Sequence, residues 1–200
     1  MKKKGRLICV EGIDQSGKKT QVGLLIKRLE KQGFQLEKIS FPDYDTPLGK
    51  EIQAFLVGKR EYNVHVRHIL YAANRWERKP EIEEWLNKER LVIVNRYSHS
   101  NLAYGLANGL DIPWLLNLEN GLPKADLVIV IDISPEASFK RKSFRRDIYE
   151  RNLSFLRKVR EAYMELSEKF PWVVVNGEKS IERTHENIWQ VVNKFLKKKL

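Results

Sequence analysis

The most constraining feature of the sequence is a short apolar run that leads into a glycine-bounded loop and then into a helical repeat. The run is Leu-Ile-Cys-Val at residues 7–10, and the loop reads GIDQSGK at residues 12–18. Gly12 and Gly17 allow the backbone to turn its N–H groups inward, and Lys18 adds a mobile positive charge. A strand, a glycine loop and a helix start in this order cradle the phosphates of a nucleotide. We refer to residues 12–18 as the P-loop.

One position departs from the usual form of this motif. The residue after the P-loop lysine ordinarily carries a hydroxyl that binds Mg²⁺, but here it is Lys19, and Thr20 follows one place later. The motif therefore predicts phosphate binding more firmly than metal binding. The residues expected to contact the nucleotide are Gly12, Ile13, Asp14, Gln15, Ser16, Gly17, Lys18, Lys19 and Thr20.

Composition favours one soluble domain. A chain of 200 residues with 42% apolar content can bury a sizeable core, so residues 1–200 are expected to form one unit. Cys9 is the only cysteine, which excludes a disulfide within the chain and fits the reducing cytoplasm. No signal peptide is recognisable, and no apolar run approaches the roughly 20 residues that span a bilayer. We therefore expect a cytoplasmic protein without a membrane segment.

The formal net charge of +11 raises the question of a nucleic-acid partner. Six of the positive charges are lysines at the two ends of the chain, at residues 2–4 and 197–199. We therefore favour a solvated surface that attracts polyphosphate substrates over a nucleic-acid binder.

Short apolar runs alternate with longer helical patterns along the whole chain. Strands are predicted at residues 7–10, 36–41, 91–94, 127–133 and 172–175. Helices are predicted at residues 20–31, 47–56, 64–78, 80–87, 101–108, 135–142, 154–169 and 181–198. Near-continuous apolar strands are buried on both faces, so the fold class is α/β, with a five-stranded parallel sheet flanked by helices on both sides. Ligands of such sheets gather at the carboxyl ends of the strands, where Glu11, Phe41, Asn95 and Asp132 stand.

Several further motifs carry a family resemblance. They are FPDY at residues 41–44, LYAANRWE at 70–77, NRY at 95–97, GLPKADL at 121–127 and DIYE at 147–150. With the P-loop, they make the sequence similar to the thymidylate kinase family from residue 7 to about residue 189. The resemblance implies a P-loop NTPase-like nucleoside monophosphate kinase fold. It also implies transfer of a phosphoryl group from ATP to dTMP, a step of dTTP biosynthesis.

The residues themselves suggest a pocket for a base. Tyr71 and Arg75 are four apart on one predicted helix, so an aromatic ring and a forked donor share a face. By the resemblance, Tyr71 stacks on thymine, Arg75 meets its O4 atom, and Asn101 helps to read the base. Asp14 would accept the sugar 3′-OH, and Tyr104 would crowd the 2′ position. The full predicted substrate set is Asp14, Phe41, Tyr44, Tyr71, Arg75, Arg96, Ser100, Asn101, Tyr104 and Tyr149.

Cations that could act on the transferred group lie at two further places. Arg96 follows a strand, where its fork can clamp phosphate oxygens, so we predict that it is catalytic together with Lys18. Residues 139–147 hold five cations in nine positions, which suits a mobile lid, at about residues 139–150, that closes over polyphosphate. Some members of the family carry a catalytic arginine in the P-loop where this chain has Gln15. The resemblance therefore assigns that role to Arg145 or Arg146, and it places Arg141 against adenine.

The resemblance also implies Mg²⁺ as the cofactor of ATP, but the sequence departs from the family where the metal is handled. Asn95 stands in place of the usual aspartate before the arginine, and Tyr44 stands where some members have arginine. We expect Asn95 to offer a neutral oxygen to the metal and Lys19 to add charge near the β-phosphate. Since phosphoryl transfer depends mainly on positioning and charge, a slow kinase is the expected outcome.

Other functions remain open at this stage. The acceptor could be dUMP, another nucleoside monophosphate or a free deoxynucleoside, and the chain could also bind nucleotides without catalysis. The family commonly forms homodimers, and an apolar stripe around Val64, Ile69, Leu70 and Ala73 would allow one here.

Overall fold

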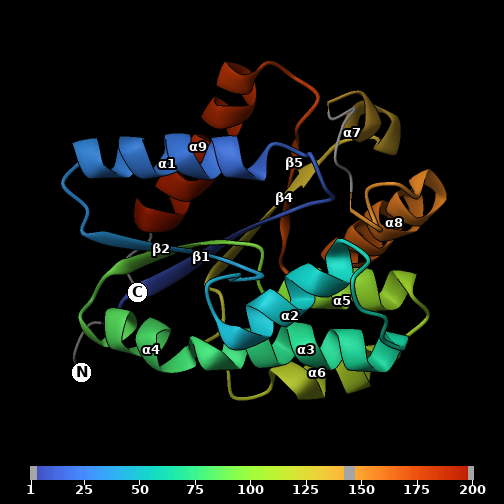
Figure 1. Cartoon of the computed structure of the whole chain (residues 1–200). Helices are drawn as coiled ribbons and strands as arrows, with labels where there is room; N and C mark the ends of the chain where they lie inside the picture. Colours follow the sequence, from blue (N-terminus) through green and yellow to red (C-terminus); the bar gives the residue numbers. More distant parts are fainter. Residues whose placement is uncertain (1–3, 142–146, 198–200) are drawn as a thin grey trace.

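A computed structural model describes residues 4–141 and 147–197 and has a five-stranded sheet at its centre (Figure 1). The strands are β1 (Arg6–Glu11), β2 (Leu36–Ser40), β3 (Leu91–Asn95), β4 (Leu127–Asp132) and β5 (Val173–Asn176). Their order across the sheet is β2-β3-β1-β4-β5, and every pair is parallel. The predicted sheet is therefore confirmed, and β1 with the P-loop after it occupies the middle of the sheet.

Helices cover both faces of the sheet. The bounds of the helices are α1 Lys18–Lys31, α2 Pro47–Leu56, α3 Val64–Glu77, α4 Lys79–Asn87, α5 Ser98–Ala107, α6 Ile112–Glu119, α7 Pro135–Arg141, α8 Leu153–Lys169 and α9 Ile181–Lys197. Helices α1 and α9 lie together on one face, and helices α2 to α6 and α8 lie on the other (Figure 1). The sheet is thus the middle of three layers.

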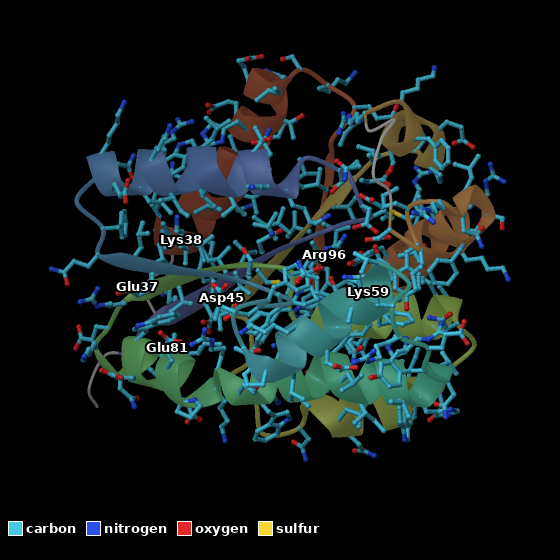
Figure 2. The ribbon with its side chains drawn as sticks, viewed as in Figure 1. Glu37, Lys38, Asp45, Lys59, Glu81 and Arg96 are labelled. Carbon is cyan, nitrogen blue, oxygen red and sulfur yellow. The ribbon has the colours of Figure 1, made fainter. Side chains whose placement is uncertain are left out.

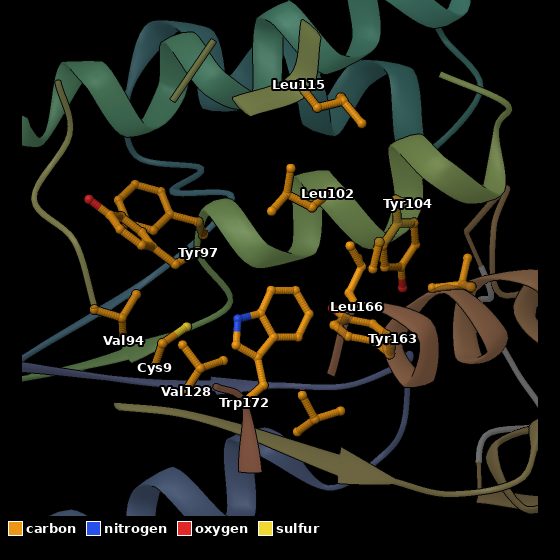
Figure 3. Packing of buried hydrophobic residues seen from close by; sticks show 14 of the residues in the cluster. Cys9, Val94, Tyr97, Leu102, Tyr104, Leu115, Val128, Tyr163, Leu166 and Trp172 are labelled. Carbon is orange, nitrogen blue, oxygen red and sulfur yellow. The ribbon is translucent and has the colours of Figure 1, made fainter. Parts of the chain in front are cut away.

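The strands supply side chains alternately to two apolar cores, because successive residues of a strand point to opposite faces. In β1, Leu7 and Cys9 join the core beneath α5 and α8, while Ile8 and Val10 join the core beneath α1 and α9. Figure 3 shows the larger core, where Cys9 lies close to Trp172 and below Leu102. Burial on both faces explains why the strands read as continuous apolar runs.

The helix α6 is absent from the sequence-based prediction. Its start carries the usual signals, since the Asp111 side chain accepts a hydrogen bond from the Trp114 N–H and Pro113 lies in the first turn. Leu115 is fully buried, and its methyl groups occupy the space beside Gly105 of α5. The helix is only eight residues long and mostly apolar, so it shows no clear amphipathic periodicity.

Charged side chains lie largely on the outer surface. Figure 2 shows sticks over the whole molecule, with Glu81 and Lys38 on outer elements and Arg96 near the middle. The Arg96 side chain is only 14% exposed. Within the described ranges, no helix is both long and apolar enough to cross a bilayer. Arg96 is therefore one of the few cations in the described ranges that point into the molecule, together with Lys18 and Arg75.

Candidate active site

The P-loop leaves the carboxyl end of β1 in a tight turn that depends on its glycines. Gly12 has φ of 135°, and a Cβ atom there would lie 2.5 Å from the carbonyl oxygen of Ile131 in β4. Gly17 has φ of 95° and caps α1 at its N-terminus. A side chain at Gly12 would push the loop off the neighbouring strand. The loop thus presents the N-terminus of a 14-residue helix to an anion.

Lys18 is folded over its own loop. Its ammonium group donates to the carbonyl oxygens of Gly12 and Ile13, at 3.0 and 2.6 Å. Burial, together with the nearby charge of Arg96, lowers the pKa of Lys18 from its ordinary value to about 7. A phosphate at the helix start would supply the negative charge that restores the protonated form. Lys19 and Thr20, in contrast, are exposed on the first turn of α1.

Asn95 ends strand β3, next to the carboxyl end of β1. Its Nδ2 group lies 3.4 Å from the Ser40 hydroxyl oxygen. Its Oδ1 atom is buried and has no hydrogen-bond partner among the described residues. A buried oxygen without a donor is compatible with a cation ligand at this position, and Mg²⁺ prefers oxygen ligands. Asn95 therefore fits the metal position, whereas the ammonium of Lys19 cannot replace the missing hydroxyl.

A cleft opens beyond the carboxyl ends of β1, β2 and β3. Its lining contains all ten residues predicted to bind the substrate, which are Asp14, Phe41, Tyr44, Tyr71, Arg75, Arg96, Ser100, Asn101, Tyr104 and Tyr149. The other lining residues are Pro42, Leu56, Tyr97 and Asp147. Aromatic rings and four acidic or basic side chains, those of Asp14, Arg75, Arg96 and Asp147, thus converge in one place, which is typical of a site for a planar, charged ligand.

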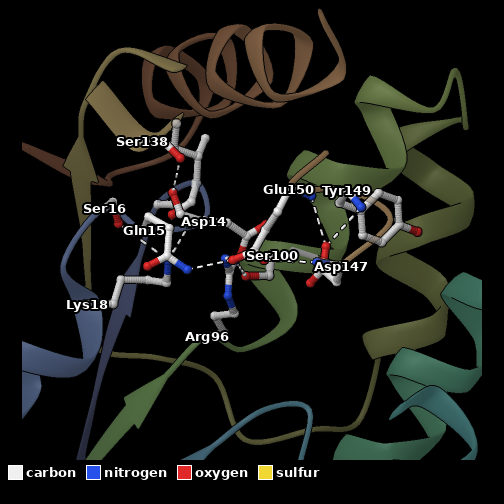
Figure 4. Close-up of polar contacts among 12 residues, drawn as sticks. Asp14, Gln15, Ser16, Lys18, Arg96, Ser100, Ser138, Asp147, Tyr149 and Glu150 are labelled. Atoms are coloured by element: carbon white, nitrogen blue, oxygen red, sulfur yellow. Dashed lines mark hydrogen bonds and ion pairs between the residues drawn. The ribbon is translucent and has the colours of Figure 1, made fainter. Parts of the chain in front are cut away.

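Arg96 lies at the P-loop end of this cleft, in the left-handed region with φ of 62°. Its guanidinium is paired with the Asp14 carboxylate and donates to the Ser100 hydroxyl at 3.2 Å. The Tyr104 hydroxyl donates to Asp14 at 2.7 Å. Burial alone would raise the pKa of Asp14, but the charges of Arg96 and Lys18 lower it, so Asp14 is a carboxylate. Figure 4 shows Asp14, Arg96 and Ser100 lying close together.

A buried carboxylate, Glu11, fixes the backbone around Arg96. Its Oε1 atom accepts the N–H groups of Tyr97 and Ser100, at 2.7 and 3.2 Å. Its Oε2 atom accepts the hydroxyls of Ser100 and Tyr163, at 2.5 and 2.9 Å. Left-handed backbone at a residue other than glycine costs about 1–3 kcal/mol, and these bonds offset that strain. Glu11 thus aims Arg96 from the neighbouring strand.

The far end of the cleft holds Arg75 on α3. Both Arg75 and Asn101, from α5, contact the carboxylate of Glu119 on α6. Tyr71 lies one turn before Arg75 and also lines the cleft. The predicted aromatic ring and forked donor therefore do share one pocket.

Comparison with known proteins agrees with this geometry. The family model described as thymidylate kinase matches residues 10–188. The chain belongs to the thymidylate kinase family. A thymidylate kinase of Arabidopsis thaliana is 39% identical over 96% of this chain and 72% of its own length. The human thymidylate kinase is 34% identical over 93% of this chain and 89% of its own. A solved thymidylate kinase structure from Candida albicans superposes with a TM-score of 0.86 at 32% identity, covering 96% of this chain and 92% of that one.

The segment that resembles the lid of thymidylate kinases is described in part. Arg145 and Arg146, the two predicted catalytic cations, lie outside the described residues. Arg141 ends α7 and donates to the carbonyl oxygens of Gln15 and Gly177, at 3.2 and 2.8 Å. Arg141 therefore lies beside the P-loop, where a nucleotide would bind.

Residues 147–150, at the end of the expected lid, return to the P-loop. Glu150 accepts a hydrogen bond of 2.5 Å from the side chain of Gln15, which stands where some family members carry arginine. Asp147 accepts the N–H groups of Tyr149 and Glu150 and lines the cleft. Burial and the Asp14 charge raise the pKa of Asp147 to about 6. Asp147 thus shares the cleft with Asp14 and Arg96.

Sequence reasoning missed the carboxylates that support the site. Glu119 belongs to the unpredicted helix, and no local pattern links it to Arg75, 44 residues away. In the sequence, Glu150 stands out only as part of the DIYE motif, and Glu11 only as the residue that follows an apolar run. Asp132, also noted after a strand, forms a two-point ion pair with Arg160 at 2.7 and 2.9 Å and is therefore structural.

Proposed function

We propose that this protein transfers the γ-phosphoryl group of ATP to dTMP, giving ADP and dTDP. The observation that carries the proposal is the position of Arg96. It stands between the P-loop, which suits a nucleoside triphosphate, and a cleft lined by Tyr71 and Arg75, which suits a pyrimidine nucleotide. Membership of the thymidylate kinase family supports the same reaction.

The roles of the residues follow from their positions. The P-loop N–H groups and Lys18 hold the β- and γ-phosphates of ATP, and Arg96 holds the acceptor phosphate and the charge that develops during transfer. Arg145 or Arg146 adds a further cation from the lid. Arg141 packs against the adenine ring. No side chain attacks the phosphorus atom, so the transfer is direct from donor to acceptor.

The nucleoside of dTMP is held along the rest of the cleft. Tyr71 stacks on the base, Arg75 donates to its O4 atom, and Asn101 faces its N3 edge. Tyr104 limits space at the 2′ carbon, and Asp14 accepts the 3′-OH. The remaining predicted contacts complete the wall, namely Phe41, Tyr44, Ser100 and Tyr149.

Mg²⁺ bound with ATP would be held at the Oδ1 atom of Asn95 and by phosphate oxygens. When bound, the ion neutralises phosphate charge and orients the donor. The buried, unpartnered oxygen of Asn95 supports this assignment. Lys19 places an ammonium on the first turn of α1, where it can interact with the β-phosphate.

We also infer that two copies of the chain pair in the cytoplasm. The predicted apolar stripe on α3 includes Ile69, which is 44% exposed, and the neighbouring Trp76 is 38% exposed. Leu116 of α6 is exposed at 40%. Exposed apolar side chains on adjacent helices are typical of an interface between subunits. Size-exclusion chromatography with light scattering should give twice the mass of 23.6 kDa.

A coupled assay of ADP release tests the reaction. ATP is kept constant, and dTMP, dUMP, dCMP and thymidine are supplied in turn. We expect clear release with dTMP, slower or comparable release with dUMP, and little with dCMP or thymidine. Release with thymidine alone would identify a nucleoside kinase. No release with any acceptor, together with intact ATP binding, would contradict the proposed kinase activity.

A further inference from the structure

Three buried residues from three helices meet at the end of the cleft that holds Arg75, where the pyrimidine base is proposed to bind. Arg75 donates from Nε to the Oε2 atom of Glu119 at 2.9 Å and from Nη2 to Oε1. Asn101 donates from Nδ2 to the same Oε1 atom at 2.7 Å. The side chains of Arg75 and Glu119 are 4% and 7% exposed, and Asn101 is 2% exposed as a whole residue. One carboxylate therefore holds both residues assigned to the base.

The amide of Asn101 is held from its other side by His68. The Oδ1 atom of Asn101 lies 2.7 Å from His68 Nδ1, and Nδ2 lies 3.3 Å from the His68 carbonyl oxygen. Burial lowers the pKa of His68 to about 4, so the ring is neutral and has one N–H. Nε2 lies 3.2 Å from the Asn108 amide nitrogen and accepts from it, which leaves the proton on Nδ1. A turned Asn101 amide would place its oxygen against the Glu119 carboxylate.

This network determines which hydrogen-bonding groups of Arg75 and Asn101 remain available to a ligand. Both Nδ2 hydrogens of Asn101 are used, so its amide can offer only the second lone pair of Oδ1. Arg75 offers only donors, and its Nη1 group has no acceptor within the described residues. A donor beside an acceptor matches the 4-carbonyl and N3–H edge of thymine or uracil. Cytosine presents a 4-amino group and a bare N3 atom, which is the reverse pattern.

We infer that Glu119 is a positioning residue that sets base selectivity, because it locks Arg75 as donor and Asn101 as acceptor and so rejects 4-amino pyrimidines. The inference rests on the proposed function and assigns a determinant of selectivity within that site. Glu119 acts through Arg75 and Asn101 and does not itself touch the base.

A role in anchoring α6 does not by itself explain why a buried carboxylate stands at Glu119. The helix is already held by fully buried Leu115, which packs beside Gly105, and by a 3.0 Å bond from the Trp76 indole N–H to the Leu118 carbonyl oxygen. These contacts persist when the charge at Glu119 is removed. A change in base selectivity therefore separates the positioning role from a purely structural one.

The test is the Glu119→Gln variant, assayed with dTMP and dCMP. Glutamine has one acceptor oxygen, which cannot serve Arg75 at two points and Asn101 as well, so the Asn101 amide is free to turn. We expect the ratio of kcat/KM for dTMP over dCMP to fall by about tenfold or more, through a higher KM for dTMP and new turnover of dCMP. The kcat for dTMP should stay within about threefold of the wild-type value. An unchanged ratio in the folded variant would overturn the inference.

Three further variants keep the test decisive. Glu165→Gln, which removes an exposed pair with Lys169 on α8, is the matched control and should leave the ratio unchanged. If Glu119→Gln does not fold, His68→Leu removes the donor to Asn101 without changing charge and should lower the ratio, while His68→Asn should restore it. Equal ratios for these two variants would also overturn the inference.

The wild-type protein separates failure of the inference from failure of the proposed function. Wild-type protein that phosphorylates dTMP and dCMP equally well would contradict the role of Glu119 but leave the kinase activity standing. Wild-type protein that phosphorylates neither would contradict the proposed function itself.

Discussion

The guanidinium of Arg96, which follows strand β3, is paired with the carboxylate of Asp14 in the P-loop, which follows strand β1. The two strands are neighbours at the centre of the sheet, so this pair spans the place where donor and acceptor phosphates would meet. An acceptor phosphate offers Arg96 a second anion, and Arg96 can turn toward it while Asp14 keeps its bond to the Tyr104 hydroxyl. The ion pair thus keeps Arg96 in the cleft before the substrate arrives.

Above neutral pH, binding of ATP should be accompanied by the uptake of a proton by Lys18. The pKa of Lys18 in the free protein is about 7, below its ordinary value, so at pH 8 most of the Lys18 population is neutral. Phosphate oxygens favour the ammonium form, so its pKa rises on binding and the affinity for ATP weakens as pH rises above 7. Calorimetry at pH 8 in two buffers of different ionisation enthalpy should show uptake of about one proton.

The matched variant for this measurement is Lys18→Arg. Its guanidinium stays charged at pH 8, so binding of ATP to it should show little proton uptake. Equal uptake by the variant and the wild-type protein would place the titrating group elsewhere.

The two positions that depart from the family should limit the rate. The double variant Lys19→Ser, Asn95→Asp restores a hydroxyl and a carboxylate where Mg²⁺ is handled, and kcat should rise by up to about a hundredfold, the usual size of one lost electrostatic contact. Steady-state rates over a range of Mg²⁺ concentrations measure this, with the two single variants alongside. A fall in activity would mean that Lys19 and Asn95 form a working adaptation.

Packing between helix α2 and the turn after β2 should be sensitive to one methyl group. A Cβ atom at Gly49 would lie 1.7 Å from the carbonyl oxygen of Asp43, which is backbone and cannot move cheaply. Gly49→Ala should lower the free energy of unfolding by about 3 kcal/mol in urea denaturation. Gly23→Ala is the control, since nothing lies within 4 Å of the added atom on α1, and it should raise that free energy by about 0.5–1 kcal/mol. Equal effects of the two variants would contradict this account of the packing.

The fold and the cleft could be predicted because their signals are local. The P-loop glycines, the apolar strands and the four-residue spacing of Tyr71 and Arg75 each occupy one short stretch of sequence. A parallel sheet then brings the ends of its strands to one edge, which places Arg96 beside Asp14 without further information.

The side chains that support the site could not be predicted, because they depend on contacts between residues far apart in the sequence. Glu11 reaches Tyr163 across 152 residues, and Glu119 reaches Arg75 from a helix without clear periodicity. Buried carboxylates of this kind carry no sequence pattern, because their partners are set by the packing of helices on the sheet. Asn101 is a further example, since the orientation of its amide depends on His68 and Glu119 together.

The central claim is that Arg96 drives the transfer by holding charge between the two phosphates. The most direct test is the steady-state rate of Arg96→Met with saturating ATP and dTMP, beside Arg90→Met, which removes an arginine from a pair with Glu37 at the opposite end of β3. We predict that kcat falls by about a hundredfold or more for Arg96→Met, and that Arg90→Met keeps the wild-type rate. A cooperative thermal unfolding transition should show that the Arg96→Met variant is folded. A folded Arg96→Met variant with a kcat within about threefold of the wild-type value would contradict the account.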